Sequence, residues 1–234
     1  QKVDENNNKK RIISLSISSD LLVYTDGFQL YLNNFPQLTE IYSSYKKAVK
    51  RAIFMKENNC TYVLCITDSK IQLLDPFKKF TVIAESKHFD YELKDIIVVE
   101  DNAFLLTVKE GKESFLFKLK LKGNSIETLK NAYFSHDAFC SMNATSTSIL
   151  LGSNFGDIII LDRFSLRKKK TFFHVHNLPI TSICIVDDFI ITGSLDYNIC
   201  LTKYVDSSNK KYNLIFSFII IFLCFFISYF LEII

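Results

Sequence analysis

The chain has 234 residues, with 28 Lys and Arg against 25 Asp and Glu, and a formal net charge of +3. A nucleic-acid-binding protein normally carries a strongly basic face, so this balance argues against a nucleic-acid partner. The six cysteines form no C-x-x-C pair and mostly lie in apolar segments, which predicts free, buried thiols in a reducing compartment and no disulfide or zinc framework. They are Cys60, Cys65, Cys140, Cys184, Cys200 and Cys224.

The first residues are polar and include the run DENNNKK, so residues 1–10 are predicted to form a polar N-terminal loop. The sequence begins with Gln1 and not with Met, and we therefore expect further sequence upstream. That expectation bears on the number of repeats that the full protein contains.

Residues 11–205 contain a repeated pattern of two apolar runs separated by a short polar turn. The pattern occurs as LLVYTDGFQLYL, YVLCITDSKIQLL, FLLTVKEGKESFLFKL, ILLGSNFGDIIIL and FIITGSLDYNICL. An interval of roughly 40 to 46 residues between the turns is typical of β-propeller blades. The turns are centred near Asp26, Asp68, Glu110, Gly156 and Asp196.

Each repeat follows a further apolar segment, such as IISLSIS or ITSICIV, and most precede another, such as FTVIAES. About four strands per repeat, with a hairpin in the middle, predict an all-β protein with a β-propeller architecture. A β-sandwich with similar strand spacing is the alternative, and the regular interval favours the propeller. Propellers of this class close with about seven blades, so we expect about two N-terminal blades upstream of the five seen in this sequence. A reduced propeller that closes with five short blades is the alternative.

The last two repeats carry the most specific motifs, GSNFGDIIILD at residues 152–162 and GSLDYNICL at residues 193–201. They resemble the Gly-Ser-x-Asp-Gly-x-Ile stretch of WD repeats, which implies a WD-repeat-like propeller. In those repeats a preceding histidine bonds the hairpin aspartate, and His176 and Asp196 occupy these two positions here. The resemblance therefore implies a structural hydrogen bond between them. The Trp-Asp pair of WD repeats is missing, since the chain has no Trp, and a Leu-Asp pair stands in its place in one repeat.

The run DRFSLRKKK, which includes Arg167–Lys170, is the most basic stretch of the chain. It is predicted to be a solvated turn between outer strands of a blade, and contact with anionic lipid headgroups is the alternative. His174 and His176 would face the same side of a shared strand, but no Cys or Asp offers the spacing of further ligands, so no metal site is predicted. The sequence has no Ser-His-Asp order, phosphate-binding Gly loop or paired-carboxylate motif, so we do not expect an enzyme that works by covalent catalysis.

The segment from Leu214 to Leu231 has no charged residue. About 18 residues make roughly 27 Å of helix, close to the hydrocarbon thickness of a bilayer, which predicts a single transmembrane helix after a juxtamembrane linker at residues 206–213. A buried helix or a pair of buried strands is the alternative, but no polar face or turn interrupts the run. Lys210 and Lys211 precede the span, so the positive-inside rule places the N-terminal domain in the cytosol. The shortness of the span suits the endoplasmic reticulum membrane.

A propeller followed by a single C-terminal membrane span resembles the endoplasmic reticulum guanine nucleotide exchange factors for the Sar-type GTPase of COPII vesicles, the prolactin regulatory element-binding protein family. The resemblance is strongest from Phe139 to the membrane segment. Within it, HVHNLPITSI from His174 to Ile183 is similar to the start of that family's final blade. Blade order, loop lengths and the position of the membrane span agree along most of the chain.

The resemblance implies a membrane-anchored factor that recruits and activates a Sar-type small GTPase at the endoplasmic reticulum, with other COPII coat components as further partners. In that family a loop of the first blade, organised by a potassium ion, ejects GDP. Nothing in this sequence matches that loop, which implies that it lies N-terminal to this chain, and no catalytic residue or cofactor is assigned here. The alternative is a tail-anchored WD-repeat scaffold for vesicle coat, tether or degradation components, without exchange activity.

Overall fold

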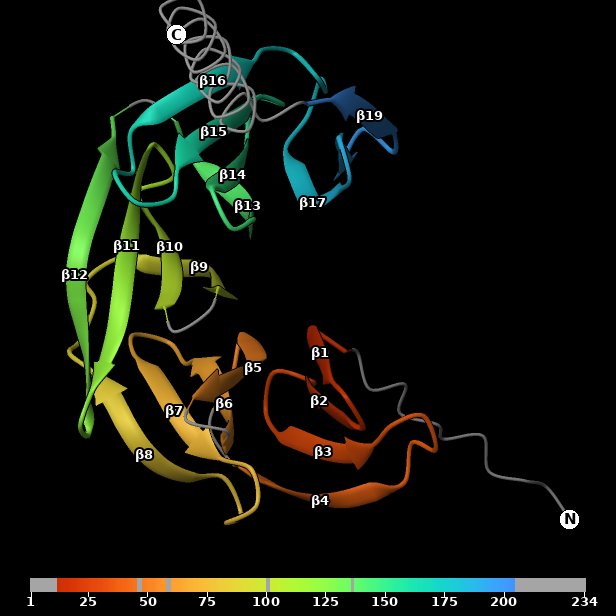
Figure 1. The fold of residues 1–234 in the computed structure, drawn as a ribbon, viewed down its shortest axis with the longest axis vertical. Helices are drawn as coiled ribbons and strands as arrows, with labels where there is room; N and C mark the ends of the chain where they lie inside the picture. The colour runs from red at the N-terminus through yellow and green to blue at the C-terminus, as the bar shows by residue number, and fades with distance from the viewer. Residues whose placement is uncertain (1–11, 46–47, 58–59, 100–101, 136, 205–234) are drawn as a thin grey trace, which may run out of the picture.

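The computed structural model describes residues 12–45, 48–57, 60–99, 102–135 and 137–204. Every helix or strand assigned in these ranges is a β-strand, and 19 strands follow one another along the chain (Figure 1). The all-β prediction is therefore confirmed for the described part of the chain. The strands form five successive antiparallel units, which we call blades 1 to 5.

Each blade is a meander in which consecutive strands are neighbours. Blade 1 consists of β1 (Ser14–Ser18), β2 (Leu21–Thr25), β3 (Leu30–Asn34) and β4 (Glu40–Tyr45). Blade 2 consists of β5 (Arg51–Glu57), β6 (Cys60–Ile66), β7 (Ile71–Asp75) and β8 (Thr81–Ser86). Blade 3 consists of β9 (Glu92–Val99), β10 (Asn102–Lys109), β11 (Glu113–Lys122) and β12 (Ser125–Phe134). Blade 4 consists of β13 (Phe139–Ala144), β14 (Ser148–Ser153), β15 (Ile158–Asp162) and β16 (Lys168–Phe172). Blade 5 consists of β17 (Ile180–Val186), β18 (Phe189–Ser194) and β19 (Ile199–Lys203) in the described residues.

The hairpin turn between the second and third strands forms in every blade at the predicted place. All five predicted turn centres, from Asp26 in blade 1 to Asp196 in blade 5, lie between these two strands. Two of the turns require glycine, because Gly27 and Gly156 have φ angles of 95° and 83°, a region that strains a residue with a side chain. The sequence pattern of five repeats is thus confirmed as five blades.

The second strand of a middle blade is buried on both faces, as β14 illustrates. All six of its residues are buried. Ile149 and Leu151 pack in a cluster with blade 3, whereas Leu150, which points the other way, packs in a cluster with blade 5. A hydrophobic cluster of this kind lies between each pair of consecutive blades. Stacking of blades therefore covers the faces that a single sheet leaves open.

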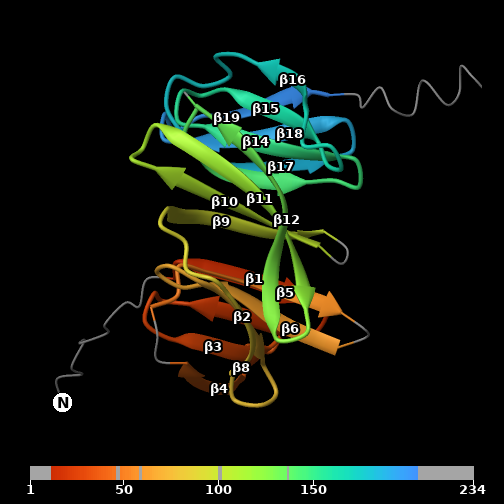
Figure 2. The same ribbon diagram turned by 90° about the vertical axis from the view of Figure 1, so that its left-hand side faces the viewer.

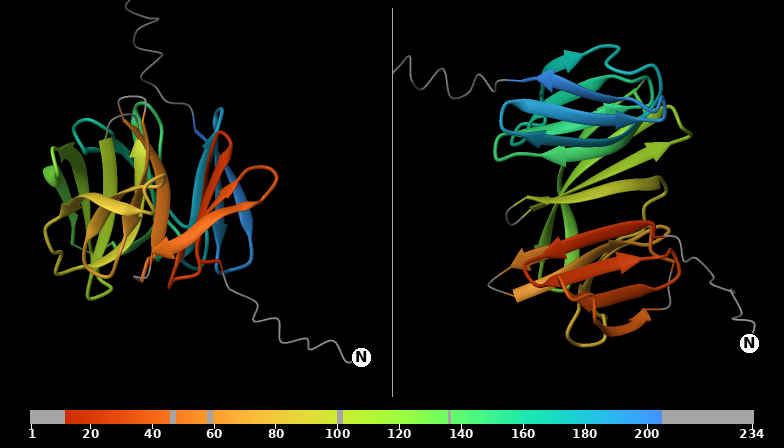
Figure 3. Two further views of the ribbon diagram at one scale, coloured as in Figure 1. Left: turned by 90° about the horizontal axis from the view of Figure 1, so that it is seen from below. Right: turned by 90° about the vertical axis from the view of Figure 1, so that its right-hand side faces the viewer.

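The first strands of the blades lie innermost and follow one another around a central axis (Figure 1). Polar contacts join β1 to β5 and β13 to β17, each pair at two points. On both strands of a pair the second contact lies two or three residues after the first, so the two strands run in the same direction. Equivalent turns of all blades consequently lie on the same side of the ring, which Figure 2 views edge-on and Figure 3 views from below and from the other edge. The contacts are Ser14 Oγ to Ala52 O at 3.2 Å, Phe54 N to Ser16 Oγ at 3.2 Å, Ser141 Oγ to Ile180 O at 2.8 Å, and Asn143 Nδ2 to Ile183 O at 3.1 Å.

The strand β12 is absent from the predicted elements. Most of its ten residues are exposed, so the apolar alternation that marks a strand is missing. It forms because it pairs along its length with β11, and its first residues also pair in parallel with β8, Ser125 opposite Glu85 and Ile126 opposite Ser86. Blades 2 and 3 thereby share one eight-stranded sheet.

Several predictions made for the chain ends fall on residues that the structure does not describe. The loop at residues 1–10, the linker at 206–213 with Lys210 and Lys211, and the membrane span at 214–231 lie outside the described residues. In the ranges that are described, no helix is long and apolar enough to cross a membrane. The membrane span therefore stays a prediction.

Apolar side chains are exposed at both ends of the arc of blades. On β19 the exposed fractions of Ile199 and Leu201 are 75% and 65%, and Leu15 and Ile17 of β1 are exposed as well. Contiguous exposed apolar side chains on a terminal sheet promote association between molecules.

We expect the propeller unit, residues 11–205, to self-associate when it is produced alone. The paired substitution Ile199→Thr and Leu201→Thr should reduce this association, because threonine keeps the strand propensity while it removes exposed apolar surface. Size-exclusion chromatography with light scattering measures the effect, and Lys203→Thr on the same strand is the control that should change nothing. A monodisperse unsubstituted fragment would contradict the expectation.

Candidate functional site

The structure brings His176 and Asp196 together at the junction of blades 4 and 5. Nδ1 of His176 lies 3.2 Å and 3.1 Å from the two carboxylate oxygens of Asp196. A carboxylate only accepts hydrogen bonds, so Nδ1 carries a proton and donates it. On the other side of the imidazole, Nε2 lies 2.8 Å from Oγ1 of Thr192 on β18. The buried imidazole thus links the loop after β16 to both the hairpin turn and the second strand of blade 5.

The carboxylate of Asp196 also organises its own surroundings. It accepts hydrogen bonds from the backbone N–H groups of Asn198 at 3.0 Å and Asn177 at 3.1 Å. Burial acts to raise the pKa of Asp196, but these two N–H groups and the His176 ring outweigh it and lower the pKa to about 2. The carboxylate is therefore charged at neutral pH, where it holds two loops together.

The hairpin turn of blade 4 holds the same loop from the opposite side. His176 N donates to Gly156 O at 3.1 Å, and His174 N donates to Oδ1 of Asp157 at 2.7 Å. A Cβ added at Gly156 would lie 1.9 Å from His176 O, so only glycine fits there without movement of the backbone. The loop that carries His176 is consequently fixed by the turns of two blades.

His174 and His176 do not lie on a shared strand. Strand β16 ends at Phe172, and both histidines lie in the loop that follows, His174 exposed and His176 buried. The φ of His174 is 53°, which is incompatible with a continuing strand. Thr192 was missed as the third member of the group, although its place directly before the Gly-Ser of the WD-like motif is a usable signal.

A second polar group joins the inner strands of three blades. Nε of Arg51 on β5 lies 3.1 Å from Oδ1 of Asp95 on β9. Asp95 also accepts hydrogen bonds from the N–H of Ile96 at 2.9 Å and of Met142, on β13, at 3.3 Å. Burial raises the pKa of the Asp95 carboxyl, and the attraction of Arg51 and the two N–H groups offsets this only in part. Nothing in the hydrophobic pattern signals this group, because it depends on which blades become neighbours.

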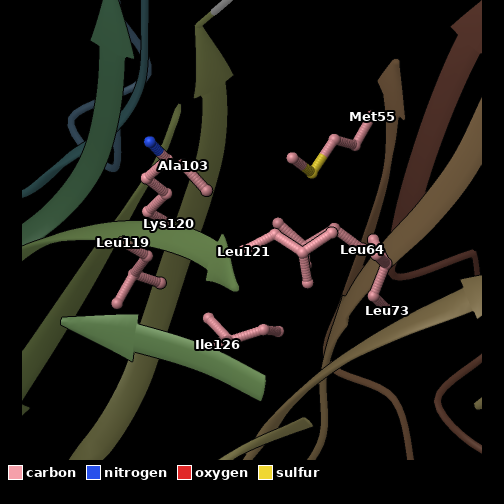
Figure 4. Close-up of a pocket in the computed structure, with 8 residues that line it drawn as sticks. All are labelled: Met55, Leu64, Leu73, Ala103, Leu119, Lys120, Leu121 and Ile126. Carbon is pink, nitrogen blue, oxygen red and sulfur yellow. The ribbon is translucent and has the colours of Figure 1, made fainter. Parts of the chain in front are cut away.

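Hollows lie along the inner strands and between blades 2 and 3. Arg51 lines a recess of about 270 Å³ among the inner strands. An open groove of about 660 Å³ runs beside the β8–β12 pair, where Lys70 and Glu85 form an ion pair at 2.9 Å. A smaller recess of about 10 Å³ has mainly apolar walls and admits at most one water (Figure 4). Its walls are formed by Met55, Leu64, Leu73, Ala103, Leu119, Lys120, Leu121 and Ile126.

The described residues give no metal-binding group and only partly support the prediction for cysteine. Within the ranges that the structure covers, no three His, Cys, Asp or Glu side chains are placed to hold a metal ion. The five cysteines in those ranges form no disulfide, but Cys60 and Cys184 are exposed and only Cys65 is buried. The expectation of buried thiols fails because Cys60 is the first residue of β6, and Cys184 lies on the first strand of the last described blade.

The basic run lies where it was predicted, at a turn between the outer strands of blade 4. Residues 163–167 connect β15 to β16, and Lys168 to Lys170 begin β16. Asp162 organises the turn, since its Oδ1 accepts hydrogen bonds from N–H of Ser165 at 2.7 Å, which lowers the pKa of Asp162. Arg163 is the exception to the solvated turn, because it is buried and donates to Ser146 O at 3.2 Å.

No family model matches the sequence, and neither does any curated protein. Solved structures share its fold. Hsv2 of Kluyveromyces marxianus, a β-propeller protein, matches with a TM-score of 0.57 and 17% identity over 82% of this chain and 58% of that one. Hsv2 of Kluyveromyces lactis matches with a TM-score of 0.56 and 15% identity over 82% of this chain and 59% of that one. The computationally designed Ika8 protein matches with a TM-score of 0.56 and 10% identity over 83% and 71% of the two chains.

At these identities the likeness shows the fold alone. It confirms the β-propeller prediction for the described residues. The chain spans about three fifths of the length of the Hsv2 chains that it matches. The activity and partners of this protein must therefore be argued from its own residues.

We expect His176→Ala to lower the free energy of unfolding of the propeller by about 1–3 kcal/mol, because it leaves the partners of a buried ring unpaired. His174→Ala is the matched control, since the side chain of His174 is exposed, and it should change stability by less than about 0.5 kcal/mol. Urea unfolding in the Ile199→Thr, Leu201→Thr background measures both variants. Equal losses for the two histidines would contradict a structural role for His176.

The lowered pKa of Asp196 makes its contribution to stability dependent on pH. A carboxyl whose pKa is lowered by folding stabilises the fold above its unfolded pKa of about 4, and this stabilisation is lost as the pH falls toward 2. We therefore expect Asp196→Asn to be less stable than the parent at pH 5, with a difference that shrinks as the pH falls to 2. Urea titrations across this range measure it, and a difference that stays constant would reject the assignment.

Proposed function

We propose that this chain forms the propeller and membrane anchor of a guanine nucleotide exchange factor for a Sar-type small GTPase, acting at the start of COPII vesicle formation. One observation carries the proposal, namely that a β-propeller is followed, ten residues after β19, by the charge-free apolar run from Leu214 to Leu231. The resemblance of residues 139–204 to that family of exchange factors supports the same function.

Nucleotide exchange requires no reactive side chain from the exchange factor. An exchange factor lowers the affinity of the GTPase for GDP by binding the nucleotide-free form more tightly, and this needs shape and rigidity but no covalent step. The blades supply rigidity, because each consecutive pair shares a hydrophobic cluster. The protein would accordingly regulate a GTPase and would not itself be a covalent catalyst.

The proposed location is the endoplasmic reticulum membrane, with the propeller in the cytosol. Lys210 and Lys211 flank the apolar run on its N-terminal side, which favours a cytosolic position for that side. Anchoring confines activation to one membrane, so a GTPase that has just been loaded with GTP is captured close to the site of exchange. Other COPII components would then assemble at the same place.

The resemblance implies a potassium ion that organises the exchange loop, and we propose no site for this ion among the described residues. In the hairpin turn of the first described blade, the carboxylate of Asp26 already accepts hydrogen bonds from the N–H groups of Phe28 and Gln29 and from the hydroxyl of Tyr31. No step of the proposed exchange is assigned to an ion bound by this part of the chain.

A tail-anchored scaffold without exchange activity is the second candidate. It is favoured by exposed aromatic rings at the tips of three hairpin turns on one side of the ring, Phe28, Phe155 and Tyr197. Aromatic side chains are enriched where proteins contact partners, so these tips offer a docking surface for coat or tether proteins. The two candidates differ in whether a partner loses its nucleotide on binding.

We expect the full-length cytosolic domain to accelerate release of labelled GDP from a purified Sar-type GTPase by at least about tenfold, which corresponds to roughly 1.4 kcal/mol of barrier. A Rab-type GTPase under the same conditions is the control and should show no acceleration. Fluorescence of the labelled nucleotide follows the reaction. Unchanged release at micromolar protein would end the exchange proposal and leave the scaffold.

A further inference from the structure

The turns that follow the third strand of each blade lie together on one side of the ring. This follows because all first strands run in the same direction and each blade is an antiparallel meander. These turns follow β3, β7, β11 and β15. Strand β19 is the third strand of blade 5, so it ends at Lys203 on this same side.

Three of these turns expose a phenylalanine within two residues of the end of the third strand. The exposed fractions of Phe77 in blade 2 and Phe164 in blade 4 are 63% and 61%, and Phe35 in blade 1 is also exposed. The same device presents the first two rings, since Oδ1 of Asp75 accepts the N–H of Phe77 at 2.9 Å and Oδ1 of Asp162 accepts the N–H of Phe164 at 3.1 Å. A repeated turn that holds a large apolar side chain in water indicates a surface made for contact.

Basic side chains accompany the exposed rings. Lys78 and Lys79 directly follow Phe77, and Arg167 and Lys168 follow Phe164 after two residues, with all four exposed. No Asp or Glu occurs in the sequence from residue 163 to residue 186. On the same side of the ring, the exposed acids of the described turns between first and second strands belong to blades 1 and 5. These acids are Asp20, Asp187 and Asp188.

We call the turns at residues 75–80 and 162–168, with Phe77 and Phe164 at their tips, the Phe-turn face. Phenylalanine beside lysine and arginine is the composition of proteins that lie on an anionic bilayer, where the ring enters the interface and the cations meet lipid phosphates. A protein partner would need acidic side chains and an apolar pocket in matching positions. An anionic bilayer offers phosphates and an apolar interface anywhere on its surface.

The path of the chain places this face near the proposed membrane. Ten residues separate Lys203, where β19 ends, from Leu214, where the apolar run begins. Even fully extended they reach at most about 35 Å. Because β19 ends on the side of the Phe-turn face, this side of the ring is held within reach of the headgroups.

We propose that the Phe-turn face docks on the anionic surface of the membrane to which the chain is anchored. The inference rests on the proposed membrane anchorage. In the docked state Phe77 and Phe164 enter the interface, and Lys78, Lys79, Arg167 and Lys168 contact lipid phosphates. The hairpin turns that carry Phe155 and Tyr197 then face the cytosol.

The absence of tryptophan from the sequence allows a direct test. The full chain is placed in nanodiscs that contain brominated and anionic lipid, with a single tryptophan introduced as Phe77→Trp or Phe164→Trp. We expect quenching at least about threefold stronger than for Tyr197→Trp, which carries the probe on the opposite side of the ring at a position that is 99% exposed. Equal quenching of all three variants would overturn the proposal.

A second test changes the charge of the protein or of the lipid. Adding Lys78→Glu and Lys79→Glu to the Phe77→Trp variant, or replacing the anionic lipid by a neutral one, should reduce the quenching of the probe because cation–phosphate contacts are lost. Quenching that is insensitive to both changes would reject anionic lipid as the partner.

Release of labelled GDP from a Sar-type GTPase, measured with the full-length protein in the same nanodiscs, separates this inference from the proposed exchange activity. Strong quenching without accelerated release supports the docked face and rejects exchange. Accelerated release without quenching rejects the docked face and keeps exchange. A chain that does not stay with the nanodiscs rejects the anchorage and the inference together.

Discussion

Burial of both faces of the second strand in the middle blades is the constraint on which the rest of the structure depends. Such a strand can be covered only if one blade lies on each side of it, and the alternating residues of β14 show this directly, with Ile149 and Leu151 packed toward blade 3 and Leu150 toward blade 5. The direction of the first strands, the common side for equivalent turns and the fixed loop at His176 all follow from that stacking.

The repeat of blades could be predicted from the sequence because burial and turn chemistry are local signals. Apolar runs on both sides of a short polar turn identify a hairpin, and Gly27 and Gly156 mark turns that need a left-handed residue. The strand β12 could not be predicted in this way, since most of its residues are exposed and its sequence lacks the apolar alternation of a strand. Its pairing with β8 depends on the fit between two blades, which no local pattern encodes.

The site shows the same division between local motif and spatial arrangement. The contact of His176 with Asp196 has a motif behind it, and Thr192 could have been found from its place beside the Gly-Ser pair. The ion pair of Arg51 with Asp95 joins strands of different blades without any repeated motif, so only the assembled blades reveal it. The propeller fold supports many activities, and the function of this protein therefore depends on its turns, its loops and the neighbouring apolar run.

The pairing of β8 with β12 has a mechanical consequence for the ring. Two four-stranded blades become one continuous sheet across that boundary, whereas at the other described boundaries no strand pairs with a strand of the next blade. Bending of the arc is therefore concentrated at the joints on either side of this double unit. We therefore expect any change in the curvature of the arc to occur first where blades 1 and 4 meet this double unit, because the described strands do not pair across those joints and pack there through hydrophobic clusters.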